Sequence, residues 1–74
     1  MSRLSDAAFE YMRRHHDGQE ITTDELWRGM KSAFPELTAV TGQRKTPRNT
    51  LMRDIRLDRL HRFEVENRRV RLKP

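Results

Sequence analysis

The 74-residue sequence contains no cysteine, only three glycines and three prolines, and no apolar run longer than three residues. Without cysteine there is no disulfide framework and no thiolate metal site, a composition that suits a reducing cytoplasm. Short apolar runs predict neither a membrane span nor a secretory segment. The expected protein is therefore a soluble, cytoplasmic one.

Catalytic signatures are also missing. The few glycines form no phosphate-binding loop, and there is no nucleophile elbow and no His-x-x-x-His spacing. We therefore predict that the chain is not an enzyme and that it uses no cofactor.

Aromatic residues are few and make up 7% of a chain that is 34% hydrophobic and 36% charged. A chain of this length is near the lower limit for one unstapled core, so residues 1–74 are expected to form a single domain. The aromatic side chains give that small core its bulk. They are Phe9, Tyr11, Trp27, Phe34 and Phe63.

Charge is abundant and unevenly distributed. Residues 1–37 carry five Lys/Arg against seven Asp/Glu, whereas residues 38–74 carry eleven against four. The second half therefore accounts for the net charge of +5. Clustered cations repel one another unless a polyanion relieves the repulsion, and nucleic acid is the obvious polyanion. Arginine-rich surfaces of ordinary proteins are the alternative explanation.

Two helices are predicted in the first half of the chain. Ser5 or Asp6 is expected to cap a first helix that runs to about residue 16, and Asp17-Gly18 is its stop. After a short extended segment at residues 20–22, Thr22-x-x-Glu25 fits the capping box of a second helix. The helical spacing of its apolar residues predicts one buried stripe. That stripe consists of Leu26, Trp27, Met30, Ala33 and Phe34.

A third helix is predicted after an irregular link. Residues 35–40 are expected to form one helical turn that buries Leu37 and Val40, followed by a basic loop. Thr46 as N-cap and Pro47 at the first helical position then begin a helix that reaches residue 57 or 60. Its inner face is Leu51, Met52 and Ile55, and its outer face is Asn49, Arg53 and Arg56.

The C-terminus predicts a β-hairpin. A two-residue turn at Asn67-Arg68 pairs Phe63 with Leu72, Glu64 with Arg71, Val65 with Val70 and Glu66 with Arg69. Each pair is apolar with apolar or acid with base, so a slip by one residue is disfavoured. Asn tolerates the positive φ that the first turn position needs.

This order of elements (α-β-α-α-β-β, mainly α with a C-terminal β-hairpin) resembles a winged helix-turn-helix domain. The Thr-Pro-Arg-Asn start at residues 46–49, the apolar-Arg-Asp-Ile helix and the Arg-rich hairpin are similar to winged-helix domains appended to phage and plasmid primase-helicases. One departure is the link between the second and third helices, which at about a dozen residues is longer than the usual tight turn.

The resemblance implies a small, sequence-specific protein that binds double-stranded DNA, either a transcription regulator or a replication accessory factor of the phage or plasmid kind. Its third helix would enter the major groove, where Arg reads guanine and Asn reads adenine. The wing would follow the backbone or minor groove, and phosphates would be met near the helix start. The DNA-binding residues so implied are Arg44, Lys45, Arg48, Asn49, Arg53, Arg56, Arg68, Arg69 and Arg71.

Two alternatives to this function stay open. The same domain is a candidate for a protein-interaction module, such as a phage-encoded factor that binds a host protein, or for an RNA-binding module. A homodimer on DNA is expected through the first helix, with Phe9 as an exposed contact. The acidic residues Asp24, Glu25 and Glu36 are then expected to face away from DNA, or to face a partner or second copy.

No metal site is predicted, because the adjacent His15 and His16 point about 100° apart on a helix. Asp54 and Asp58 are expected to pair with arginines on neighbouring turns rather than to form a catalytic pair. Trp27 and Phe34 are interpreted as core residues rather than stacking platforms for single strands.

Overall fold

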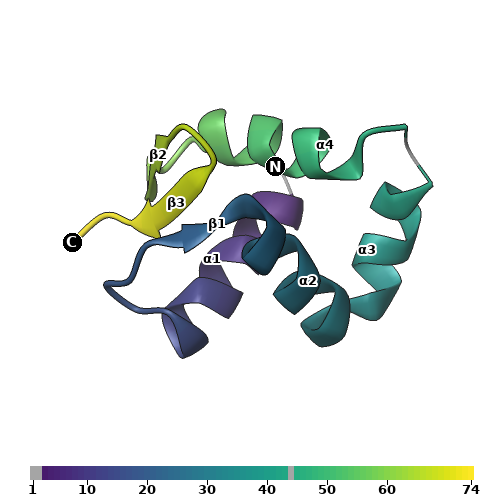
Figure 1. The fold of residues 1–74 in the computed structure, drawn as a ribbon, viewed down its shortest axis with the longest axis horizontal. Coiled ribbons are helices and arrows are strands. Elements are labelled where there is room, and N and C mark those ends of the chain that lie inside the picture. The colour runs from purple at the N-terminus through teal and green to yellow at the C-terminus, as the bar shows by residue number, and fades with distance from the viewer. Residues whose placement is uncertain (1–2, 44) are drawn as a thin grey trace.

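The computed structural model describes residues 3–43 and 45–74. These residues form four helices and one small antiparallel sheet of three strands (Figure 1). The sheet lies at one end of the molecule and α3 at the other, with α4 along one side (Figure 1). Within the described ranges, no helix has the length and apolar character needed to cross a membrane. The elements in chain order are α1 (Arg3–His15), β1 (Ile21–Thr22), α2 (Thr23–Ala33), α3 (Pro35–Gly42), α4 (Pro47–Arg56), β2 (Phe63–Glu66) and β3 (Arg69–Leu72).

The predicted cap of α2 is confirmed. Thr22 is extended (φ −78°, ψ 158°), and its Oγ1 accepts a hydrogen bond from the backbone N–H of Glu25 at 3.1 Å. The Thr22 hydroxyl also lies 3.2 Å from the Glu25 carboxylate. One of the unsatisfied amides at the helix start is thereby paired, and β1 passes directly into α2.

The predicted start of α1 at Ser5 or Asp6 is wrong. The helix already begins at Arg3, so both residues lie inside it. Ser5 is buried on the inner face, while the Asp6 carboxylate accepts from Arg62 Nη2 at 2.8 Å. Both side chains are committed to tertiary packing, which outweighs their local preference for a cap.

The link between α2 and α4 contains a longer helix than expected. α3 spans eight residues, and its buried residues are Thr38 and Thr41, whereas Val40 is 67% exposed and Leu37 is half-buried. The predicted burial of Val40 is therefore wrong. Thr38 Oγ1 donates to the Phe34 carbonyl at 2.9 Å, which satisfies the hydroxyl within its own helix and lets a polar residue face inward.

The predicted stripe of α2 is correct in its first three residues and wrong at its end. Leu26, Trp27 and Met30 are buried. Ala33 is exposed and Phe34 half-buried, because α2 ends at Ala33 and Phe34 leaves helical geometry (φ −131°, ψ 66°) to begin α3. The Pro35 that follows disfavours a helical conformation at Phe34.

α4 has the two faces predicted for the third helix. Thr46 is its N-cap and Pro47 begins it, although the Thr46 side chain makes no capping hydrogen bond. Leu51, Met52 and Ile55 are buried, and Asn49, Arg53 and Arg56 are exposed. The inner face packs on α1 and α2 and leaves the polar face to solvent.

The hairpin has the predicted register throughout, from Phe63 opposite Leu72 to Glu66 opposite Arg69. Asn67 takes the positive φ expected at the turn (φ 56°). β1 adds to the other edge of β3, with Ile21 opposite Val70, to give the strand order β1-β3-β2. In addition, Thr23 N–H donates to the Arg68 carbonyl at 2.9 Å, so the hairpin turn is tied to the start of α2.

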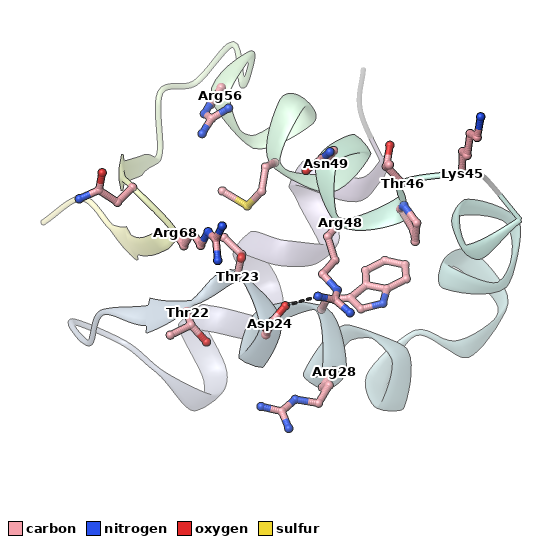
Figure 2. Close-up of a pocket in the computed structure, with 14 residues that line it drawn as sticks. Thr22, Thr23, Asp24, Arg28, Lys45, Thr46, Arg48, Asn49, Arg56 and Arg68 are labelled. Carbon is pink, nitrogen blue, oxygen red and sulfur yellow. Dashed lines mark hydrogen bonds and ion pairs between the residues drawn. The ribbon is translucent and has the colours of Figure 1, made fainter.

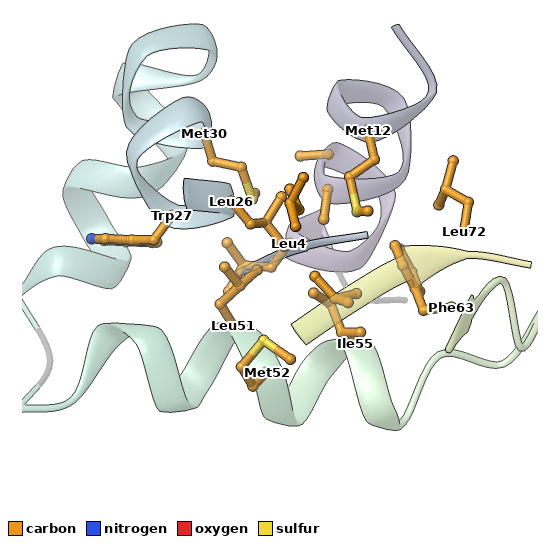
Figure 3. Packing of buried hydrophobic residues seen from close by; sticks show 14 residues of the cluster. Leu4, Met12, Leu26, Trp27, Met30, Leu51, Met52, Ile55, Phe63 and Leu72 are labelled. Carbon is orange, nitrogen blue, oxygen red and sulfur yellow. The ribbon is translucent and has the colours of Figure 1, made fainter. Parts of the chain in front are cut away.

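A single apolar core joins the helices to the sheet (Figure 3). Its most deeply buried side chains are Met12, Leu26, Met30, Leu51 and Val70. Trp27 belongs to this core, as predicted.

Phe9 is not the exposed contact that was predicted for dimer formation. Phe9 is half-buried, and its ring lies edge-on to the Phe63 ring with 6.4 Å between the two centroids. Arg62 Cζ lies 4.6 Å from the centroid of the Phe9 ring. The sheet and Arg62 therefore already cover much of this ring.

Candidate nucleic-acid interface

A hollow of about 800 Å³ lies where the start of α2, the first turns of α4 and the hairpin turn meet (Figure 2). Among the described residues, five cations line it, and Asp24 is the one carboxylate that does so. The cations come from α2, from the residues at and before the start of α4, from the last turn of α4 and from the hairpin. They are Arg28, Lys45, Arg48, Arg56 and Arg68. This balance makes the hollow attractive to anions.

The fold brings these residues together through two connections. The Thr46-Pro47 start places Arg48 and Asn49 in the first turn of α4 while the apolar face of that helix lies on the core. The backbone bond from Thr23 to Arg68 holds the hairpin turn beside the start of α2. Residues far apart in the sequence thus share one surface.

Five of the residues predicted to bind DNA line this hollow. They are Lys45, Arg48, Asn49, Arg56 and Arg68. Asn49 and Arg56 are seven residues apart, a spacing that places them on one face of α4. Two of the predicted base-reading residues, Asn49 and Arg56, therefore share the hollow with some of the predicted phosphate-binding residues.

Arg53, Arg69 and Arg71 are exposed but do not line the hollow. On a helical projection of α4, Arg53 and Arg56 lie on opposite sides of Asn49. Arg69 Nη1 is paired with Glu20 Oε1 at 3.2 Å, and Arg71 Nε donates to Glu64 Oε2 at 2.6 Å. Arg44, the remaining residue of the predicted set, lies outside the described residues.

Asp24 lies among the predicted DNA-binding residues rather than away from them. Its Oδ1 is 2.6 Å from Arg48 Nη1, and both side chains are 59% exposed (Figure 2). At that exposure an ion pair stabilises the fold by only about 0–1 kcal/mol. The pair matters more for the charge that it places in the hollow than for stability.

Sequence reasoning missed Arg28. It follows Asp24 by four residues on α2, so a helical projection of residues 23–33 places both on the face opposite Leu26 and Met30. The spacing is visible in the sequence, but the packing of α2 beside α4 is needed to place Arg28 near the other cations.

A second polar cluster, formed by Asp6, Asp58 and Arg62, lies away from the hollow, between α1 and the loop that follows α4. Arg62 donates from Nε to Asp58 Oδ2 at 3.0 Å and from Nη2 to Asp58 Oδ1 at 2.9 Å, which confirms that Asp58 pairs with a neighbouring arginine. These side-chain hydrogen bonds lower the pKa of the Asp58 carboxyl, and burial opposes them only in part. The same bonds raise the pKa of Arg62, with a further contribution from Asp6.

Among residues 3–43 and 45–74, no three His, Cys, Asp or Glu side chains lie close enough together to hold a metal ion. The rings of His15 and His16 lie 6.4 Å apart, and each is close to the ring of Tyr11.

Comparison with protein-family models, with curated proteins and with solved structures finds no match for this chain.

Proposed function

We propose that this chain binds double-stranded DNA through the hollow between α2, α4 and the hairpin, in the manner of a winged helix. The observation that carries the proposal is the convergence of five cations from separate elements beside the exposed first turn of α4. The mainly helical fold with its small antiparallel sheet is compatible with this layout. A role as a transcription regulator or replication accessory factor is a narrower form of the same proposal.

Within this proposal, Asn49 and Arg56 read base edges in the major groove. They share the exposed face of α4, and their side chains match the hydrogen-bonding patterns of adenine and guanine. Arg53, exposed on the same helix, adds a contact at the edge of this surface.

Lys45 and Arg68 bind phosphates on either side of the base-reading residues. Lys45 precedes the start of α4, where helix amides also favour an anion, and Arg68 stands in the hairpin turn. Arg28 contributes from α2. Arg69 and Arg71 are paired with carboxylates in the free protein, so they add weaker contacts to the flanking backbone than Arg68 does.

Selection from a randomised duplex pool tests this function. The wild-type chain is expected to enrich a defined motif, and Arg56→Ala is expected to weaken binding to that motif by about 1–3 kcal/mol and to relax the base preference at one position. Arg13→Ala is the matched control, because Arg13 is an exposed arginine on α1 outside the hollow. An unenriched pool, or equal losses in both variants, would contradict sequence-specific recognition.

Two exposed leucines favour a second candidate function, that of a protein-interaction module. Leu57 is 67% exposed and Leu60 is 70% exposed, with Arg59 between them in the loop after α4. An interface centred there predicts that Leu57→Ser and Leu60→Ser abolish a partner complex and leave duplex binding unchanged. The DNA-binding function predicts instead that substitutions of residues lining the hollow weaken duplex binding more than the two leucine substitutions do.

A further inference from the structure

We propose that Asp24 makes DNA binding in the hollow more selective. By pairing with Arg48, Asp24 lowers the affinity for the phosphate backbone more than the affinity for a recognised base sequence. The inference deepens the proposed function and rests on it. Of the described residues that line the hollow, Asp24 is the one carboxylate.

The position of Asp24 is well determined by the fold. It is the second residue of α2. It follows the Thr22 cap and Thr23, whose backbone amide bonds to the hairpin turn. From there its Oδ1 reaches Arg48 Nη1 at 2.6 Å across the gap between α2 and α4 (Figure 2). The contact joins two residues that are 24 positions apart in the sequence, so the tertiary fold creates it.

The charge of Asp24 acts against phosphate. A phosphate that enters the hollow to meet Arg48 also approaches the carboxylate, and the two anions repel each other. In the free protein Arg48 is already paired, so its net gain from a phosphate is smaller than that of an unpaired arginine. Sequence-independent binding depends almost entirely on such phosphate contacts.

Base edges carry no net charge and are affected less by the carboxylate. The Arg48 guanidinium has five N–H donors, and the Asp24 contact engages Nη1. Donors therefore remain for a base edge, and the orientation of the side chain is fixed before binding. Selectivity rises because the competing, sequence-blind mode is weakened.

Asp24→Asn tests this inference against a matched control, Glu25→Gln. Glu25 is the next residue in the same first turn of α2, is exposed and does not line the hollow. Each substitution removes one negative charge from the chain and from the start of α2. The two substitutions therefore differ only in whether the lost carboxylate lined the hollow. Each variant is titrated against a duplex of arbitrary sequence and against the motif that wild type enriches, at several salt concentrations.

Asp24→Asn is expected to bind the arbitrary duplex roughly threefold to tenfold more tightly than wild type, with a smaller change for the motif. The plot of log affinity against log salt is expected to steepen by about 0.9, the contribution of one further phosphate contact. Glu25→Gln is expected to change both quantities less. Adding Arg48→Ala to Asp24→Asn is expected to remove the extra slope.

Equal effects of the two substitutions would overturn the inference, because only overall charge would then matter. Weaker binding of Asp24→Asn to both duplexes would also overturn it and would assign Asp24 a structural role, for which thermal unfolding of each variant is the accompanying readout. These results differ from a failure of the proposed function, in which wild type itself binds no duplex.

Discussion

Arg62 shows how much one side chain contributes to this small fold. Its guanidinium bonds to Asp58 and Asp6, and it lies over the rings of Phe9 and Phe63 at 4.6 and 5.9 Å from their centroids. The side chain thereby joins α1, the loop after α4 and the start of β2. A cation on an aromatic face contributes about 0.5–2 kcal/mol, so these contacts stabilise the fold.

Asp58→Asn is expected to destabilise the fold by about 2 kcal/mol near neutral pH, because Arg62 then loses its buried charged partner. The Asp58 side chain is 5% exposed and that of Arg62 is 17% exposed, so solvent replaces the lost contact only in part. Urea unfolding measures the difference. Asp17→Asn, at an exposed aspartate in the turn after α1, is the control and is expected to change stability little.

The same pair predicts a pH dependence of stability. Because the pKa of Asp58 is lowered in the folded chain, the unfolded chain binds more protons in acid. The contribution is therefore fully present above the ordinary carboxyl pKa and is lost as the pH falls through the folded value. Asp58→Asn is expected to narrow the difference in stability between about pH 7 and about pH 3. An unchanged difference would contradict this role.

At the scale of elements, Tyr11 of α1 packs directly against Gly29 of α2. A Cβ built there would overlap the Oη and Cζ atoms of Tyr11. Tyr11 is half-buried, lies beside the rings of His15 and His16, and its hydroxyl is 3.3 Å from His16 Nε2. The absence of a side chain at Gly29 therefore provides the space that Tyr11 occupies.

Gly29→Ala is expected to destabilise the fold by about 1–2 kcal/mol, because the cost of overpacking exceeds the gain in helix propensity. Thermal unfolding followed by circular dichroism measures the change. Gly42→Ala is the control, since a Cβ at Gly42 meets nothing within 4 Å. Equal or greater stability of Gly29→Ala would show that Tyr11 moves aside at little cost.

Local patterns predicted those elements in which several signals agree. The Thr22 cap of α2, the two faces of α4 and the hairpin register each follow from short-range spacing, and all are found. The capping box itself is only half formed, because the Glu25 carboxylate contacts the Thr22 hydroxyl rather than its backbone N–H. The errors at Ser5, Val40 and Phe9 have another cause. Their burial depends on which distant element covers them, and a threonine that bonds within its own helix can replace an aliphatic residue inside.

At the scale of the whole molecule, the charge split overstates the number of cations available to a ligand. Several arginines of the basic half pair with carboxylates of the chain, and three of these carboxylates, Asp6, Glu20 and Asp24, belong to the acidic half. The two halves therefore partly neutralise each other in the fold. The convergence of Lys45, Arg56 and Arg68 on one hollow could not be read from composition, since it depends on the position of the hairpin turn against α2.

This distribution of pairs predicts unequal salt effects along the hairpin. Arg68→Ala is expected to lower the slope of log affinity against log salt by about 0.9, as one phosphate contact is lost. Arg71→Ala is expected to lower it less, because Glu64 already holds that guanidinium. Fluorescence anisotropy with a labelled duplex at several salt concentrations measures both slopes. Equal slopes for the two variants would show that hairpin pairing does not govern binding.

The measurement that tests the central claim most directly is a nuclear magnetic resonance titration of the isotope-labelled chain with duplex DNA. The account predicts that signals shift most for residues around the hollow, including the side chains of Arg48, Asn49, Arg56 and Arg68. Signals of the loop that holds Leu57 and Leu60 are expected to change little. An unchanged spectrum, or shifts confined to that loop or to α1, would contradict the claim that the hollow binds DNA.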